Sequence, residues 1–198
     1  MVRISSFFSD FADEELCLSF CNTVPNRRAD QKTDKLQSFQ DLVSWFRKRE
    51  LISSKQAAKL ENPGPKSTAL LMRATELSEA TYRLFAATSE NKSSTLDDIA
   101  ILNRSLAPAL ASVRMNASKK PFLLDYGETP ESLNGPIAIS AANLLASPDA
   151  GRVRTCDGAT CTWLFIDRTK NKSKRWCEMS DCGNRAKQRR HYERIKKR

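Results

Sequence analysis

The chain reads CDGATC at residues 156–161 and CEMSDC at residues 177–182. Four residues separate the two cysteines of each pair, and fifteen residues separate the pairs. Two tight cysteine pairs that a hairpin brings together can supply the four soft ligands of tetrahedral Zn²⁺. The spacing therefore predicts a zinc module over residues 151–198, with one ion held by Cys156, Cys161, Cys177 and Cys182.

Two disulfides are the alternative for these four cysteines. Residues 1–20 lack the basic start and apolar run of a secretory signal peptide, so we expect a cytoplasmic protein. In a reducing compartment, clustered cysteines bind metal more often than they form disulfides. Because four thiolates close the coordination shell, we expect the zinc to be structural rather than catalytic.

The residues around the cysteine pairs predict the rest of the module. We expect residues 163–166 to form a strand, 167–173 a basic turn and 174–176 the returning strand. After Gly183 the chain has no helix breaker as far as Arg198 and is rich in basic residues, which predicts a basic helix. Two cysteine knuckles, a hairpin and a helix make a treble-clef-like finger.

Two stretches carry a resemblance to known families. Residues 182–185 read CGNR, with WC at 176–177 and WLF at 163–165 before them, and this part resembles the CGNR zinc finger. Residues 16–24, LCLSFCNTV, resemble the opening helix of the ABATE domain, which precedes that finger in a family of bacterial stress-induced transcription regulators. The resemblance implies a mainly helical N-terminal domain, which could act as a sensor, and a DNA-binding finger.

The positive charge of the chain is concentrated near its end. The 198 residues carry a net charge of +10. Residues 151–198 hold 15 Lys/Arg and 5 Asp/Glu, whereas residues 1–150 hold 18 of each. A neutral domain joined to a strongly basic module predicts a polyanionic partner. No apolar run approaches the ~20 residues of a membrane span, so we expect a soluble protein without a membrane partner.

Residues 1–150 predict a helical domain, and the fold class is therefore mainly α. Leu16, Phe20 and Val24 repeat at helical spacing in a first helix that we expect to begin at the acidic residues 13–15 and to stop near Pro25. Further helices are expected from an N-cap at Ser38 to residue 51, from residue 53 or 54 to 60, over 66–89, from an N-cap at Ser94, and over 131–146. Residues 112–115 and 122–126 are a candidate β-hairpin, and Ser147-Pro148 predicts a short helix that enters the finger without a flexible linker.

Basic and amide side chains of the turn and the last helix are the candidate contacts with nucleic acid. In a major groove Arg can read guanine and Asn or Gln adenine, while Lys and Arg hold phosphates. The predicted contacts are Arg168, Lys172, Lys174, Arg175, Asn184, Arg185, Lys187, Gln188, Arg189, Arg190 and Arg194. A solvated tail that serves solubility is the alternative interpretation of this charge.

Two other partners compete with DNA. Trp163, Phe165, Trp176 and Tyr192 could stack on the unpaired bases of RNA, although we expect the Trp and Phe side chains to form the small core around the zinc. Alternatively, zinc only staples a protein-interaction module whose basic surface meets an acidic protein. A homodimer would strengthen a weakly binding single finger, but the sequence fixes no interface.

The remaining candidate sites are weaker. The chain has one histidine and no P-loop, GxSxG, HExxH or dinucleotide-binding motif, so we expect no enzymatic activity. Cys17 and Cys21 lie four residues apart on one helical face, where a redox pair is conceivable but buried thiols are expected. Asn22, Arg27 and Arg28 could line a pocket for a small-molecule effector, with helix capping and a solvated loop as the alternative.

Overall fold

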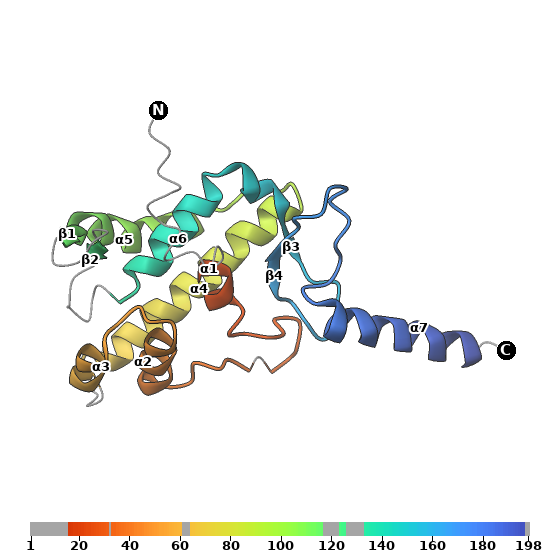
Figure 1. Cartoon of the computed structure of the whole chain (residues 1–198), viewed down its shortest axis with the longest axis horizontal. Helices are drawn as coiled ribbons and strands as arrows, with labels where there is room; N and C mark the ends of the chain where they lie inside the picture. The colour runs from red at the N-terminus through yellow and green to blue at the C-terminus, as the bar shows by residue number, and fades with distance from the viewer. Residues whose placement is uncertain (1–15, 32, 61–63, 117–122, 126–132, 197–198) are drawn as a thin grey trace.

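The computed structural model describes residues 16–31, 33–60, 64–116, 123–125 and 133–196 (Figure 1). Within these ranges α-helices dominate, which confirms the mainly α fold, and each sheet has two strands. In chain order the elements are α1 Leu16–Cys21, α2 Phe39–Lys48, α3 Ser54–Leu60, α4 Ser67–Ser89, α5 Leu96–Ser112, β1 Arg114–Asn116, β2 Leu123–Asp125, α6 Gly135–Leu145, η3 Pro148–Arg152, β3 Val153–Thr155, β4 Leu164–Ile166, η4 Met179–Gly183 and α7 Asn184–Lys196.

Local capping chemistry fixes where several helices begin. Ser38 caps α2 as predicted: its hydroxyl accepts from the Asp41 N–H, and the Asp41 carboxylate accepts from the Ser38 N–H. The cap of α5 is Thr95, not Ser94, because the Thr95 hydroxyl accepts from the Asp98 N–H at 3.2 Å. This cap places the Asp98 carboxylate on the guanidinium of Arg83, which lowers the pKa of Asp98.

Other predicted boundaries differ in detail. The first helix ends at Cys21 rather than near Pro25, because Thr23 already turns back to bond the Phe20 carbonyl through both its N–H and its hydroxyl. Helix α5 continues through Pro108 to Ser112. The candidate hairpin is present as β1 and β2, and Ser147 caps η3. The expected beginnings at residues 13–15 and 131 lie outside the described residues.

Helix α4 runs along the body and is the centre of the hydrophobic core (Figure 1). Its apolar stripe includes Leu70, Leu77 and Phe85, which pack in one cluster with α1, α2 and α6. Cys17 and Cys21 are fully buried in this cluster, as expected of thiols that serve as small apolar groups. Burial raises the pKa of Cys21, whose sulfur lies 3.4 Å from the Ser78 carbonyl.

The hairpin of the finger lies elsewhere than predicted. Strand β4 pairs antiparallel with β3, which precedes the first cysteine pair, and not with residues 174–176. The predicted turn closes instead into a loop around the buried Asp167 carboxylate, which accepts from the Thr169 N–H and hydroxyl and from the Lys174 N–H at 2.6–2.9 Å. The first knuckle therefore forms the tip of the hairpin, and residues 174–176 form no strand.

The hairpin joins the core of the helical domain. Val153, Leu164 and Ile166 belong to the same hydrophobic cluster as α1 and α4. The Asn22 side chain acts like an added strand residue: its amide donates to the Leu164 carbonyl at 2.9 Å, and its carbonyl accepts from the Leu164 N–H at 2.8 Å. The hydrophobic core is thus continuous from the helical domain into the finger, as the absence of a flexible linker predicts.

Because of these two bonds, we expect the Asn22 side chain to contribute strongly to the stability of the folded chain. Asn22→Ala removes both partners of the Leu164 backbone, so we expect it to lower the free energy of unfolding by about 1–3 kcal/mol in urea titrations. The matched control is Asn26→Ala, since Asn26 accepts one exposed local bond from Arg28, and its loss is expected to stay below about 0.5 kcal/mol. Equal losses in the two variants would show that the Asn22 bonds do not join the two parts.

Candidate metal centre and nucleic-acid interface

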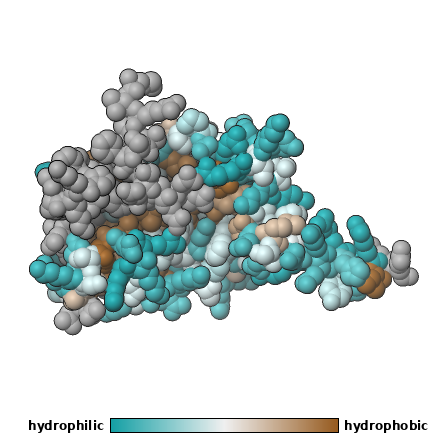
Figure 2. All heavy atoms as spheres, in the orientation of Figure 1, coloured by the Kyte–Doolittle hydropathy of each residue, from teal (hydrophilic) through white to brown (hydrophobic). Residues whose placement is uncertain are grey.

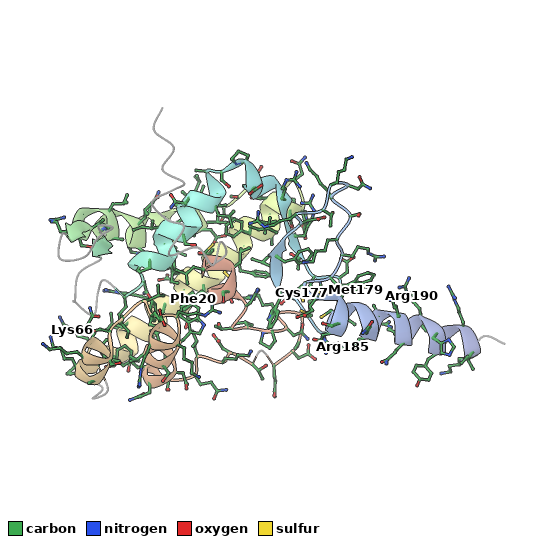
Figure 3. The ribbon with its side chains drawn as sticks, viewed as in Figure 1. Phe20, Lys66, Cys177, Met179, Arg185 and Arg190 are labelled. Carbon is green, nitrogen blue, oxygen red and sulfur yellow. The ribbon has the colours of Figure 1, made fainter. Side chains whose placement is uncertain are left out.

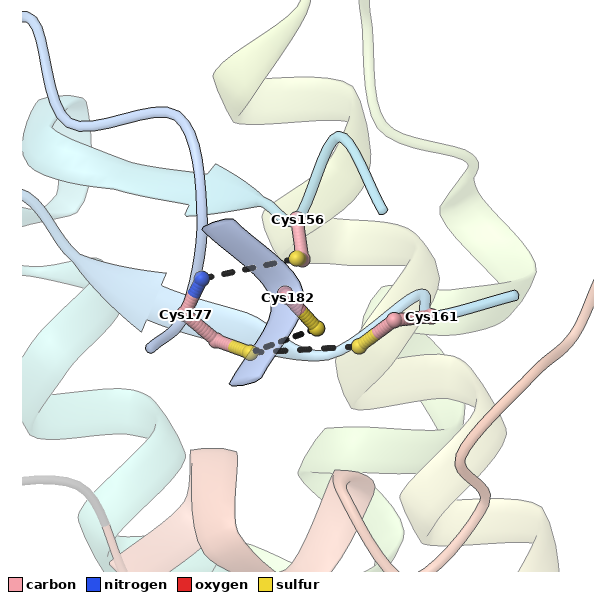
Figure 4. Close-up of side chains that lie close together, drawn as sticks. All are labelled: Cys156, Cys161, Cys177 and Cys182. Carbon is pink, nitrogen blue, oxygen red and sulfur yellow. Dashed lines mark hydrogen bonds between the residues drawn. The ribbon is translucent and has the colours of Figure 1, made fainter. Parts of the chain in front are cut away.

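The four predicted zinc ligands converge on one point (Figure 4). Their sulfur atoms all lie within 4.8 Å of one another, with 3.7 Å between Cys177 and Cys182 and 3.9 Å between Cys161 and Cys177. A disulfide needs about 2.05 Å between sulfurs. A regular tetrahedron of 2.3 Å Zn–S bonds has edges of about 3.8 Å. The sulfurs therefore stand at metal-ligand separations, and all four cysteines are free thiols.

Hydrogen-bond donors surround the sulfurs and favour the thiolate form. The Gly158 and Cys177 N–H groups each donate to the Cys156 sulfur at 3.4 Å, and the Arg185 guanidinium donates to the Cys182 sulfur at 3.1 Å. Burial opposes ionisation of Cys156, but hydrogen bonds, first those from the Cys177 and Gly158 N–H groups, outweigh it, so the pKa of Cys156 is lowered. Burial raises the pKa of Cys161 to about 11, and a bound cation supplies the charge that makes its thiolate favourable.

The residues present therefore fit one Zn²⁺ held by Cys156, Cys161, Cys177 and Cys182. All four donors are sulfur, and together they fill the four coordination positions of a structural zinc site. The expected small core is also present, since buried Phe165 packs with the cysteines while Trp163 and Trp176 cover them partly. The ion would hold the two knuckles together and would supply no catalytic water.

Gly158 leaves space for the sulfurs. A Cβ at this position would lie 3.1 Å from the Cys161 Cβ, 3.3 Å from the Cys182 sulfur and 3.4 Å from the Cys156 sulfur. Each of these separations is tight, so a side chain at residue 158 would push on three of the four ligands. The first knuckle is therefore shaped by the glycine as well as by its cysteines.

Helix α7 leaves the second knuckle and projects away from the body (Figure 1). None of its residues is buried, and most of its visible surface is hydrophilic (Figure 2). Its thirteen residues include six Lys or Arg and one Glu. An isolated helix of this length is marginal in water, so its attachment at the knuckle matters for its stability. Arg185 and Arg190 both lie on this helix (Figure 3).

All eleven predicted nucleic-acid contacts are exposed, but they do not form one face. Arg168 lies near Asp149, at the start of the loop that follows β4, whereas Arg175 lies beside the first knuckle. Asn184 and Arg185 also serve the second knuckle, donating to the Ser180 carbonyl and the Cys182 sulfur. On α7, Arg185, Arg189 and Arg190 line a groove beside the first knuckle, whereas Gln188 does not.

The sequence interpretation missed the residues that shape the loops. Asp167 folds the basic loop, and its pKa is lowered, first by the Thr169 hydroxyl. An acidic residue directly after an apolar strand, within a basic segment, was the available signal. Gly158 is the second such residue, and a glycine between two zinc ligands was the signal there.

The predicted effector residues lie at the junction with the finger. Asn22 bonds Leu164, the Arg27 N–H donates to the Thr162 hydroxyl at 2.9 Å, and the Arg28 guanidinium donates to the Gly158 carbonyl at 3.2 Å. The Arg27 guanidinium is nearly buried between Glu79 and the Tyr82 ring. Their contacts join the two parts of the chain, and a ligand-binding role for them stays a prediction.

Comparison with known families agrees with this geometry. Residues 152–195 match the CGNR zinc finger, and residues 14–148 match the family described as "Putative stress-induced transcription regulator", ABATE. The chain belongs to the ABATE family. The ABATE match covers the helical domain as far as Pro148, and the zinc-finger match begins at the strand β3 boundary. Neither description names an enzyme, and no curated protein gives a match.

Across the described parts of this ABATE-family chain, no helix is both long and apolar enough to cross a membrane.

The geometry of the first knuckle predicts the effect of a single methyl group. Gly158→Ala should weaken zinc binding about 10- to 100-fold, because the added Cβ displaces the sulfurs of Cys156 and Cys182. Competition with a chromophoric chelator measures the affinity. The control is Gly151→Ala, whose Cβ would meet nothing within 4 Å and which should leave zinc affinity unchanged. Unchanged affinity in Gly158→Ala would contradict the proposed crowding.

Proposed function

We propose that the protein is a transcription regulator that binds duplex DNA through its zinc finger, with α7 as the main contact. The observation that carries this proposal is an exposed basic helix attached to a metal-held knuckle, at the end of the chain that bears the whole charge excess. An α-helix with its side chains is about 10–12 Å across, which matches the width of about 12 Å of the major groove. Family membership supports a role in transcription.

The charges of the finger suit a duplex. On the helix, Lys187, Gln188 and Arg194 are exposed and can reach base edges or phosphates, and the loop around Lys172 adds further positive charge. Counterion release from neutralised phosphates would supply most of the affinity. Zinc would act indirectly, by fixing where α7 leaves the body.

The helical domain is the proposed sensor or regulatory module. Residues 22–28 hold the finger through hydrogen bonds to Leu164, Thr162 and Gly158. A conformational change in this segment would therefore move the first knuckle. The core that α1 and α4 share with β3 and β4 gives the same coupling. The effector itself would act by biasing this junction.

Salt dependence tests the DNA-binding proposal. The zinc-loaded protein should bind a fluorescent random-sequence duplex with a slope of about −3.6 or steeper in log K against log salt, as for four or more phosphate contacts. Removal of zinc by a chelator should abolish this binding, because α7 is then no longer held. Fluorescence anisotropy across a salt series makes the measurement.

The matched controls for this test are single charge removals. Lys48→Gln, on the exposed end of α2, should leave the slope unchanged, whereas Arg194→Gln should reduce it by about one. No binding at low salt by the folded, zinc-loaded protein would overturn the proposal. Stronger binding to single-stranded RNA, or binding only to an acidic protein, would replace DNA by that partner.

A further inference from the structure

A groove of about 470 Å³ separates the first knuckle from α7. One wall consists of residues 157–160 with Arg175 and Trp176, and the other of Arg185, Arg189 and Arg190 on α7. The groove holds four arginines and two carboxylates, those of Asp157 and Glu193. Arginines therefore outnumber carboxylates two to one among the lining residues, and both walls contribute arginines.

Three of these arginines are held in place through their Nε atoms, which leaves their terminal N–H groups available. Arg175 donates its Nε to the Asp157 carboxylate at 2.7 Å, and Arg189 donates its Nε to Glu193 at 2.9 Å. Arg190 donates its Nε to the Ala186 carbonyl at 3.4 Å. The terminal N–H groups of these three guanidinium groups have no hydrogen-bond acceptor among the described residues. One hydrogen bond orients each guanidinium, with the Trp176 ring beneath that of Arg175, and the terminal N–H groups remain available for an anion.

Such forks match the oxygens of a phosphate. A guanidinium binds a phosphate with two parallel N–H···O bonds, which a lysine ammonium cannot do. The Arg175 and Arg189 side chains are 61% and 67% exposed, so an incoming phosphate reaches them without a large desolvation cost. Arg185 differs because it is committed to the Cys182 sulfur and to Asp181.

We propose that this groove holds the phosphodiester backbone of one nucleic-acid strand, an inference that rests on the proposed DNA-binding function. The strand lies between Arg175 on the knuckle side and Arg189 and Arg190 on α7. At 100° per residue, Lys187 and Gln188 each lie about 130° from the middle of the arc that the groove-lining arginines span, on the side turned toward the bases. Arg194 lies about 40° from Arg190, on the flank of the groove. A strand fits better than a small ligand, because the exposed residues Ala159 and Thr160 leave the rim of the groove open.

The first test removes charge from both walls. Arg175→Gln with Arg189→Gln, in the full zinc-loaded chain, should reduce the salt slope on a random-sequence duplex by about 1.8, for two lost phosphate contacts. Lys170→Gln with Lys187→Gln removes the same charge outside the groove and should reduce the slope by less, because neither side chain lines the groove. Unchanged zinc content and circular dichroism check the fold of each double variant. Equal reductions in the two would overturn the groove assignment.

A second pair of variants adds charge and leaves every basic residue in place. Ala159→Asp puts a carboxylate on the rim of the groove and should weaken duplex binding about tenfold. Ser173→Asp puts the same charge on the exposed basic loop outside the groove and should weaken binding several-fold less. Equal effects of the two substitutions would contradict a strand in the groove.

The outcomes separate this inference from the proposed function. If the wild-type protein binds no duplex, the DNA-binding proposal fails and the groove assignment with it. If the wild-type protein binds but the groove variants behave like their controls, only the groove assignment fails. Inorganic phosphate and a deoxynucleoside monophosphate, at matched ionic strength, should not compete with the duplex; competition at equal ionic strength would mean that the groove takes a small phosphorylated ligand instead.

Discussion

Convergence of four sulfurs on one point is the constraint on which the outer half of the finger depends. Cys156 and Cys161 come from the tip of the β3–β4 hairpin, and Cys177 and Cys182 from the segment that leads into α7. Burial opposes the ionisation of Cys161 and Cys177, so four thiolates are stable together only around a cation. One ion thereby joins a loop of low intrinsic stability to a hairpin that is already part of a core.

The two faces of that hairpin serve different purposes. Val153, Leu164 and Ile166 face the helical domain, whereas Phe165 faces the cysteines. The strand β4 therefore belongs to both cores, and Asn22 fixes its backbone from the helical side. Because α7 attaches through the zinc to this strand, its direction relative to the body follows from contacts made by residues 22–28. This is the route by which the helical domain would influence α7 in the function proposed above.

The sequence predicted most of the elements because their signals are local. Helical periodicity, the Ser38 cap and the cysteine spacing each depend on residues a few positions apart, and all three are confirmed. The prediction that β4 pairs with residues 174–176 was wrong. Its pairing with β3 depends on the burial of Val153 in the core and on the loop around Asp167, which no local pattern specifies. The same limit applies to Asn22, whose partner is 142 residues away. The groove could not be predicted either, since its two walls come from residues 157–160 and from α7, which no local pattern places together.

Hydrogen exchange with and without zinc tests the central claim most directly, namely that the metal holds α7 and the knuckles while the core holds the hairpin. With zinc removed, we expect the amides of residues 177–196 and of the first knuckle to exchange much faster, because the ion is the strongest link between these segments and a few hydrogen bonds remain without it. The amides of β3, β4 and α4 should stay protected, since Val153, Leu164 and Ile166 remain packed in the core. Slow exchange in α7 without zinc, or loss of protection in the strands together with α7, would contradict the account.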